Sequence, residues 1–185
     1  MSSDEMNLYS GHCVDPTKIT PEDIELVDIA HPLSLICRGT GHVKFFFSVA
    51  QHSINCAVEA EARGLSTEVQ LACLLHDAGE AYCSDVIRPV KKHLNGYAEI
   101  EERIQRAVLA RFHVEAIRDS SGWEQVRAID NDMLTNEACA LFTDSTGFSP
   151  APLRSSPPIL FRPPEEVERE FTELAVKLGA VSPLS

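Results

Sequence analysis

The sequence carries too little positive charge for a nucleic-acid-binding surface. Its 185 residues include 16 lysines and arginines against 28 aspartates and glutamates, and the formal net charge is −12. Binding to long nucleic acids depends on a basic face that displaces counterions, so we expect no long nucleic acid among the partners. A small anion can still bind in a locally basic pocket. If the chemistry concerns nucleotides, a mononucleotide is therefore the better match.

Long apolar segments and paired cysteines are also missing. No apolar run approaches the roughly 20 residues that span a bilayer, and the acidic start, Met1 to Met6, lacks the basic and apolar regions of a signal peptide. We therefore expect a cytoplasmic protein without membrane association. The six cysteines form no C-x-x-C pair. Most lie in apolar segments, where a reduced cysteine packs as a small hydrophobe, and we predict that they are structural.

The hydrophobic pattern predicts an all-α protein in a single domain over 1–185, a size that can bury its own core. Strand signals are weak throughout. One helix starts with a capping box, Ser48 followed by Gln51, and the next starts at Ser66 or Thr67. The helical periods cover 48–63, 66–80, 97–112, 122–142 and 165–178.

Residues 144–164 differ from the rest of the chain. They hold six of the eleven prolines and show no helical or strand period. This predicts an extended loop, followed by a C-terminal helix over 165–179. Three roles are open for the loop: a lid, a dimer arm or a surface excursion. We favour a dimer contact or a surface position over a lid, and we expect a homodimer.

The pair His76-Asp77 is the most informative feature, because it follows a helical run, 69–75, in which Gln70 is the one polar residue. A buried helix seldom ends with an imidazole beside carboxylates, unless these groups hold a cation that offsets their desolvation. Glu80 lies over the same patch of the helix by its spacing. His52 faces inward from its own helix. The competing interpretation is a structural network of ion pairs around a helix end.

A further ligand is expected from the helix that carries Asp130 and Asp132, and periodicity does not choose between them. Two imidazoles and two carboxylates suit one catalytic divalent cation: Mn²⁺, Co²⁺, Fe²⁺, Ni²⁺ or Zn²⁺, with Mg²⁺ also compatible. Burial beside a second carboxylate would raise the pKa of Glu80, as a proton donor requires. Arg38 and Arg88 are natural phosphate clamps, because a guanidinium fork matches phosphate oxygens.

Five ordered segments resemble the HD-domain superfamily of metal-dependent phosphohydrolases, whose signature is H…HD…D. Within it, the chain is most similar to bacterial 5′-deoxynucleotidases and related hydrolases, over residues from about 20 to 142. The resemblance implies a compact HD-domain helical bundle with the metal site between helices. The matching segments are 35–38, 48–53, 74–82, 84–91 and 129–130.

The resemblance also assigns roles, and it favours Asp130 over Asp132. The implied metal ligands are His52, His76, Asp77 and Asp130. The implied catalytic residues are Glu80 for proton transfer, Asp77 at the metal and Arg38, which orients the phosphate. The implied substrate contacts are Arg38, Asp77, Asp85 and Arg88. Glu137 follows Asp130 by seven residues, as in the D-x6-E pattern of similar proteins.

One position departs from the pattern of these relatives. They carry tryptophan directly after the arginine equivalent to Arg38, where it helps to select the deoxy sugar, and this chain has Gly39. The sugar preference is therefore open. The pocket is either roomier or filled by His42 or by the run Phe45–Phe47, so His42 joins the predicted substrate contacts. We favour packing over base stacking for the three phenylalanines.

The leading hypothesis is a phosphohydrolase that uses metal-activated water to remove phosphate from a small nucleotide, above all a 5′-(deoxy)nucleoside monophosphate. One alternative is a (deoxy)nucleoside triphosphate hydrolase of the same fold. A second is a non-catalytic nucleotide-binding HD module. A third is a structural protein that contains a buried polar network and binds no metal.

Overall fold

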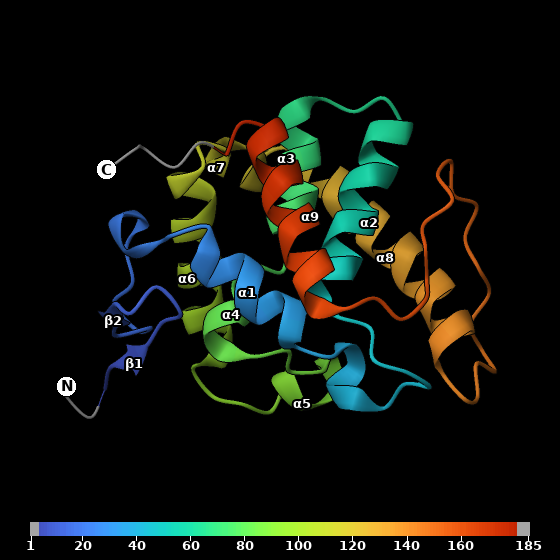
Figure 1. Cartoon of the computed structure of the whole chain (residues 1–185), viewed down its shortest axis with the longest axis horizontal. Helices are drawn as coiled ribbons and strands as arrows, with labels where there is room; N and C mark the ends of the chain where they lie inside the picture. Colours follow the sequence, from blue (N-terminus) through green and yellow to red (C-terminus); the bar gives the residue numbers. More distant parts are fainter. Residues whose placement is uncertain (1–3, 181–185) are drawn as a thin grey trace.

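The computed structural model describes residues 4–180 and is mostly helical (Figure 1), which confirms the all-α fold. No helix in this part of the chain is both long and apolar enough to cross a bilayer. The strands between residues 4 and 180 form one small antiparallel hairpin, β1 (Met6–Asn7) with β2 (Cys13–Val14). The 3₁₀ turns are η1 (Pro21–Asp23) and η2 (Arg38–Gly41). The helices are α1 (Val27–Leu35), α2 (Val49–Ala62), α3 (Thr67–Leu75), α4 (Glu80–Cys83), α5 (Arg88–Lys91), α6 (Tyr97–Arg111), α7 (Glu115–Arg118), α8 (Ser121–Leu141) and α9 (Pro164–Lys177).

Helix α2 begins where its capping residues predict. Ser48 Oγ accepts a hydrogen bond from the backbone N–H of Gln51 at 3.1 Å, and Gln51 Oε1 accepts one from the N–H of Ser48 at 3.3 Å. This reciprocal pair satisfies two backbone donors that a helix start leaves free. At α3 the capping side chain is Ser66, which accepts from the N–H of Val69 at 3.4 Å.

The predicted end of α3 near Glu80 is wrong, because the helix stops at Leu75 and a turn follows. The physical reason is Gln105 on α6, a buried side chain that replaces helical hydrogen bonds. Its Nε2 donates to the Leu75 carbonyl at 2.8 Å, and its Oε1 accepts from the Gly79 N–H at 3.2 Å. His76 and Asp77 thus lie on a turn rather than on a regular helix.

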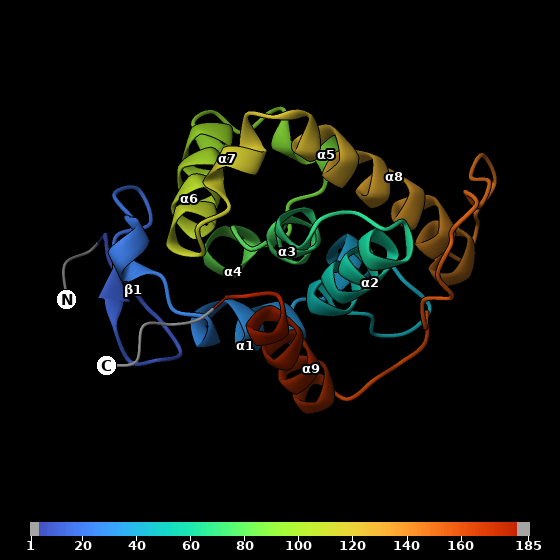
Figure 2. The ribbon, with the colours of Figure 1, turned by 90° about the horizontal axis from the view of Figure 1, so that it is seen from above.

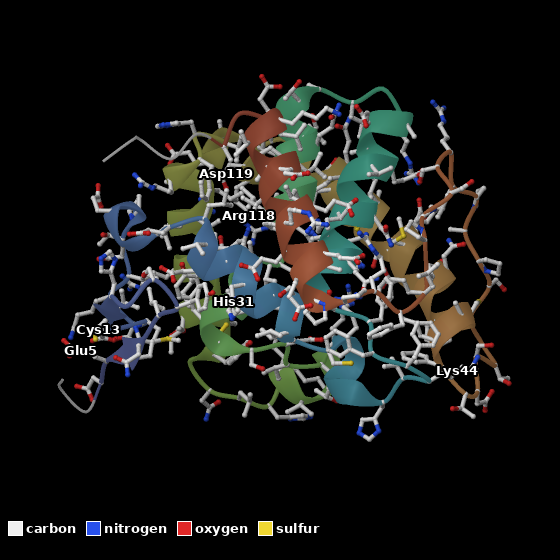
Figure 3. All side chains as sticks on the ribbon, in the orientation of Figure 1. Glu5, Cys13, His31, Lys44, Arg118 and Asp119 are labelled. Atoms are coloured by element: carbon white, nitrogen blue, oxygen red, sulfur yellow. The ribbon has the colours of Figure 1, made fainter. Side chains whose placement is uncertain are left out.

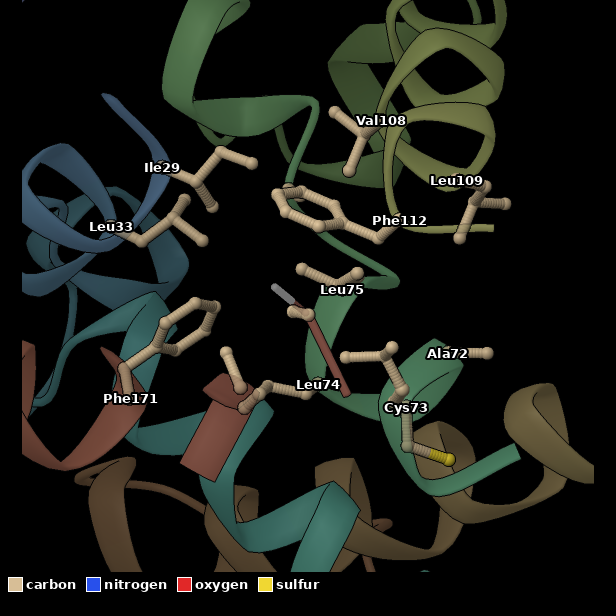
Figure 4. Packing of buried hydrophobic residues seen from close by; sticks show 14 of the residues in the cluster. Ile29, Leu33, Ala72, Cys73, Leu74, Leu75, Val108, Leu109, Phe112 and Phe171 are labelled. Carbon is tan, nitrogen blue, oxygen red and sulfur yellow. The ribbon is translucent and has the colours of Figure 1, made fainter. Parts of the chain in front are cut away.

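Helix α3 lies at the centre of the protein, as Figure 2 shows, between α1 and α9 on one side and α6 to α8 on the other. Its apolar side chains are fully buried on all sides, so the run that precedes His76 is core. In Figure 4, Leu74 and Leu75 lie near Phe171 of α9 and Phe112, which follows α6. Burying a leucine of this kind contributes about 1.5–3 kcal/mol. This packing fixes the position of the turn that follows α3.

The Pro-rich segment runs along the surface without helix or strand over 144–163, and α9 begins at Pro164, the last residue of the predicted loop; the segment is visible in orange beyond α8 in Figure 1. Side chains of α2 and α8 hold it in place. The fully buried carboxylate of Glu59 accepts hydrogen bonds from the N–H groups of Arg154 and Ser155, from the Ser155 hydroxyl, and from Arg63. These bonds hold the pKa of Glu59 at about 2, although burial opposes the shift. The homodimer stays a prediction.

Replacing Glu59 with glutamine is expected to destabilise the protein by about 2–3 kcal/mol, because several donors lose a charged acceptor. The folded pKa of Glu59 lies below its usual 4.5. Its contribution is therefore complete above pH 4.5 and is lost as the pH falls toward about 2. Urea unfolding at pH 7 and pH 3 measures both effects. Glu61→Gln is the matched control, since Glu61 is on the exposed face of the same helix and its ion-pair partner within residues 4–180 is Lys177. Equal midpoints for the two variants would contradict the role of Glu59.

Candidate metal centre

Four side chains from three parts of the chain meet at one point. His52 comes from α2, the pair His76-Asp77 from the turn after α3, and Asp130 from α8. His52 Nε2 lies 3.2 Å from both His76 Nε2 and Asp130 Oδ1, and His76 Nε2 lies 3.3 Å from Asp77 Oδ2. The cross distances are 3.7 Å from His76 to Asp130 and 3.8 Å from His52 to Asp77. Atoms bound to one cation at about 2.1 Å lie roughly 3.0–3.4 Å apart, so this spacing suits a shared ion.

The hydrogen bonds of the two imidazoles point their free nitrogens at each other. His76 Nδ1 lies 2.7 Å from the Cys73 carbonyl, and His52 Nδ1 lies 2.9 Å from Glu137 Oε1. A carbonyl only accepts, so Nδ1 of His76 carries a proton, and the Glu137 carboxylate favours the same tautomer for His52. Two bare Nε2 atoms then face each other at 3.2 Å. This arrangement requires a positive charge between them, either a proton or a metal ion.

The charges around the site also favour a positive charge between the two imidazoles. Burial alone would lower the pKa of His76, but the carboxylates of Asp77 and Asp130 outweigh it and raise that pKa well above 6.5. Burial would raise the pKa of Asp130, yet the adjacent imidazoles of His52 and His76 hold it far below the usual range. Both carboxylates are therefore ionised and turned toward the imidazoles, as cation ligands would be.

His52, Cys56 and His76 could hold a metal ion, because one donor atom from each lies within 4.8 Å of the others. The sequence predicts a structural role for Cys56, as for the other cysteines, and does not place it among the candidate ligands. Its spacing of four residues from His52 on one helix was the available signal. Sγ lies 3.6 Å from His52 Nε2. Burial, with Glu137 and Asp130 nearby, raises the pKa of the thiol well above 9, so the two aspartates are the more available anionic donors.

Arg38 and Glu80 border the same point, as predicted. Arg38 Nη1 lies 3.3 Å from Asp77 Oδ2, and its Nε lies 3.6 Å from Glu137 Oε2. Glu80 is buried, and within residues 4–180 no group forms a hydrogen bond to its Oε2. Burial, and then the negative charges of Asp77 and Asp85, raise the pKa of Glu80 well above 4.5. This shift favours the protonated, neutral form of the side chain.

A cavity of about 490 Å³ opens beside these residues, a size suited to a small ligand. The predicted Asp85 and Arg88 lie on its wall. Asp85 accepts a hydrogen bond from the Gly39 N–H at 3.2 Å, and Arg88 Nη2 lies 3.2 Å from Asp130 Oδ2. The charged lining residues are Arg38, Asp77, Glu80, Asp85, Arg88, Lys91, Asp130 and Glu137. The apolar lining residues include Val43, Leu134, Ala138, Leu141, Phe142 and Phe148.

The structure does not bring His42 to the cavity, which corrects its prediction as a substrate contact. The backbone of Gly39 and Thr40 is left-handed (φ 59° and 51°), and His42 is exposed beyond this turn, outside the cavity lining. The run Phe45–Phe47 does not line the cavity either. The ring of Phe142 instead lies next to Gly39, with Cε1 3.7 Å from where a Cβ would stand.

Comparisons with known proteins identify relatives but no activity. No family model matches the chain. The chain is 34% identical over 142 residues to the uncharacterized protein YfdR of Escherichia coli, which covers 77% of this chain and 75% of the relative. It is also 34% identical over 178 residues to the uncharacterized protein RCAP_rcc00048 of Rhodobacter capsulatus, which covers 89% and 90%.

Proposed function

The chain belongs to the family of YfdR and RCAP_rcc00048, and we propose that it is a metal-dependent phosphohydrolase of the HD type. The proposed reaction removes phosphate from a 5′-(deoxy)nucleoside monophosphate. One observation carries this proposal: two imidazole Nε2 atoms and two carboxylates converge within 3.2–3.8 Å, and these carboxylates, Asp77 and Asp130, line a nucleotide-sized cavity. Such a donor set, with its open side toward a cavity, is typical of catalytic rather than structural metal sites.

The proposed ligands of one divalent transition-metal ion are His52, His76, Asp77 and Asp130. When bound, such an ion supplies an activated water molecule and takes up charge on a phosphoryl oxygen. Glu137 and the Cys73 carbonyl hold the two imidazoles in the tautomer that presents Nε2, which is how ligand histidines are commonly oriented. The chain thus provides both the ligands and the groups that align them.

Arg38 and Glu80 have separate roles in this proposal. Arg38 holds the phosphate, because its guanidinium is fixed beside the metal centre by Asp77 and Glu137. Glu80 donates a proton to the leaving sugar oxygen, since it lines the cavity and its raised pKa favours the protonated form. Its Oε2, which has no hydrogen-bond partner in the described part of the chain, supports catalysis over simple nucleotide binding. A binding module would gain stability from a paired or apolar residue at this position.

The charge of the cavity supports a monophosphate over a triphosphate. Its lining contains three basic residues, Arg38, Arg88 and Lys91, against five acidic residues. Arg88 and Lys91 already form ion pairs, with Asp130 and Glu101 respectively. A triphosphate would bring two further charged groups into this acidic surrounding without matching cations. One phosphate beside Arg38 and a metal ion is the better balanced ligand.

A comparison of 2′-deoxyadenosine 5′-monophosphate and its triphosphate tests the proposal. We expect release of inorganic phosphate from the monophosphate, with added Mn²⁺ or Co²⁺, at a kcat/KM at least about tenfold above that for the triphosphate. Chelation of the metal should abolish both reactions. Analysis of the products distinguishes release of inorganic phosphate from release of tripolyphosphate. Release of tripolyphosphate as the dominant reaction would favour the triphosphate hydrolase. Nucleotide binding without turnover, under any divalent ion, would favour the binding module.

A further inference from the structure

We propose that Phe142 and Phe148 form the wall that contacts the nucleobase, so that the Pro-rich segment 144–164 takes part in substrate recognition. This inference rests on the proposed function, because it assigns the far end of the same cavity. The ligand class is a planar aromatic ring carried on a sugar phosphate. It replaces our earlier preference for the segment as a dimer contact or an inert surface.

The cavity lining changes character along α8. Asp130, Leu134, Ala138 and Leu141 recur at three- and four-residue intervals and therefore share one face of this helix. Asp130 is at the metal centre, whereas the last three carry only hydrocarbon. A helix rises about 1.5 Å per residue, so Ala138 lies about 12 Å from Asp130 along the axis. This length is comparable to that of an extended nucleoside monophosphate, whose phosphate end is charged and whose other end is a flat ring.

Two aromatic rings stand at this apolar end. The rings of Phe142 and Phe148 meet edge to face, with centroids 5.8 Å apart, and both line the cavity. Phe148 keeps 39% of its surface exposed, although it belongs to a loop that is otherwise attached to the protein. Aromatic side chains stack on nucleobases with useful affinity, because every base has a π face. The exposed ring is therefore placed where a base would cover it.

Both rings are held before any ligand binds. Lys44 attaches the turn after Arg38 to the end of α8: its N–H donates to the Leu141 carbonyl at 2.8 Å and its Nζ to the Ala140 carbonyl at 3.1 Å. Figure 3 shows Lys44 near the loop that follows α8. This contact fixes the neighbourhood of Phe142.

The loop is fastened on the other side of Phe148 as well. The Ala151 N–H donates to Thr135 Oγ1 at 3.2 Å, and the Ala151 carbonyl accepts from Asn136 Nδ2 at 3.0 Å. Phe148 thus lies three residues before an anchor on α8 and six residues after Phe142. A ring held in this way binds a base with little loss of conformational entropy.

The test compares Phe148→Ala with wild type on two substrates, 2′-deoxyadenosine 5′-monophosphate and the base-free 2-deoxyribose 5-phosphate. We expect kcat/KM for the nucleotide to fall about tenfold, while kcat/KM for the sugar phosphate stays within twofold. Phe161→Ala is the matched control, because Phe161 is in the same loop, is 55% exposed and lies outside the cavity lining. This control should leave kcat/KM unchanged for both substrates. Equal losses for both substrates, or no loss for the nucleotide, would overturn the proposal.

A binding measurement separates this inference from the proposed function. Calorimetry with the nucleoside 2′-deoxyadenosine, which has no phosphate to hydrolyse, is expected to give about tenfold weaker binding to Phe148→Ala than to wild type. This result would stand even if no metal supported turnover, in which case the hydrolase assignment alone would fail. Unchanged affinity in the variant, or the absence of nucleoside binding by wild type, would refute the aromatic wall.

Discussion

Replacing His76 with alanine is expected to abolish the proposed binding of a divalent ion and to lower kcat/KM by about 10³-fold or more. The ion contributes several kcal/mol to charge stabilisation in reactions of this type, and each 1.36 kcal/mol corresponds to a factor of ten. His76 supplies one of the two nitrogens that face each other at 3.2 Å, so its loss opens the centre of the site. Metal content by elemental analysis and phosphate release measure the two effects in the same preparation.

Matched variants make this experiment specific. Asp130→Asn should behave like His76→Ala, whereas Asp132→Asn should keep metal and activity, because Asp132 pairs instead with Arg63 at 2.8 Å. Cys56→Ala tests the third donor of the His-Cys-His group and should keep the metal if the aspartates are the ligands. Metal loss in Cys56→Ala with retention in Asp130→Asn would transfer the site to the cysteine. Full activity of His76→Ala would end the hydrolase proposal.

Replacing Glu80 with glutamine is expected to lower the catalytic activity without destabilising the protein. Loss of the proton donor should lower kcat about 10²- to 10⁴-fold, the range for general acid catalysis. Metal binding should persist, because Glu80 is not among the four proposed ligands. Single-turnover rates and metal content distinguish this outcome from a collapse of the site. A rate within about twofold of wild type would exclude Glu80 as the acid.

The same variant should be more stable than wild type when both are free of metal at alkaline pH. The folded pKa of Glu80 lies above its usual 4.5. At a pH between 4.5 and the raised pKa of the folded protein, Glu80 keeps a proton in the folded chain and releases it in the unfolded chain. The free energy of unfolding therefore falls as the pH rises through this range. Glutamine removes this cost, and each kcal/mol recovered raises Tm by about 2–4 °C in a domain of this size. Thermal unfolding at pH 5 and pH 8 should show a gain for Glu80→Gln that is larger at pH 8.

The residues that converge at the centre were predictable because each carries a local signal. His76-Asp77 ends an apolar run, His52 lies on the inner side of a capped helix, and a carboxylate was expected from the 130–132 region. The choice between Asp130 and Asp132 was not available from periodicity, because both lie near the edge of the buried face of α8. In the folded protein, packing turns Asp130 toward His52, whereas Asp132 forms an ion pair with Arg63.

What could not be predicted depends on contacts between distant segments. The end of α3 at Leu75 is set by Gln105, thirty residues away, and a glutamine in an amphipathic helix carries no sign of that role. The position of Phe148 could not be predicted for the same reason. It lies in a proline-rich stretch with no period, so only the anchoring of Ala151 to α8 reveals where the ring stands. A long-range hydrogen bond made by a single side chain produces no periodic pattern in the sequence.

The bridge from Gln105 to both ends of the broken helix has one more consequence. Because the amide of a neighbouring helix completes the backbone bonding of the His76-Asp77 turn, the turn keeps its shape whether or not an ion occupies the centre. If the centre binds an ion as proposed, that ion could then be exchanged in the native protein without refolding, and selection among ions would depend on ligand chemistry and supply rather than on assembly of the scaffold.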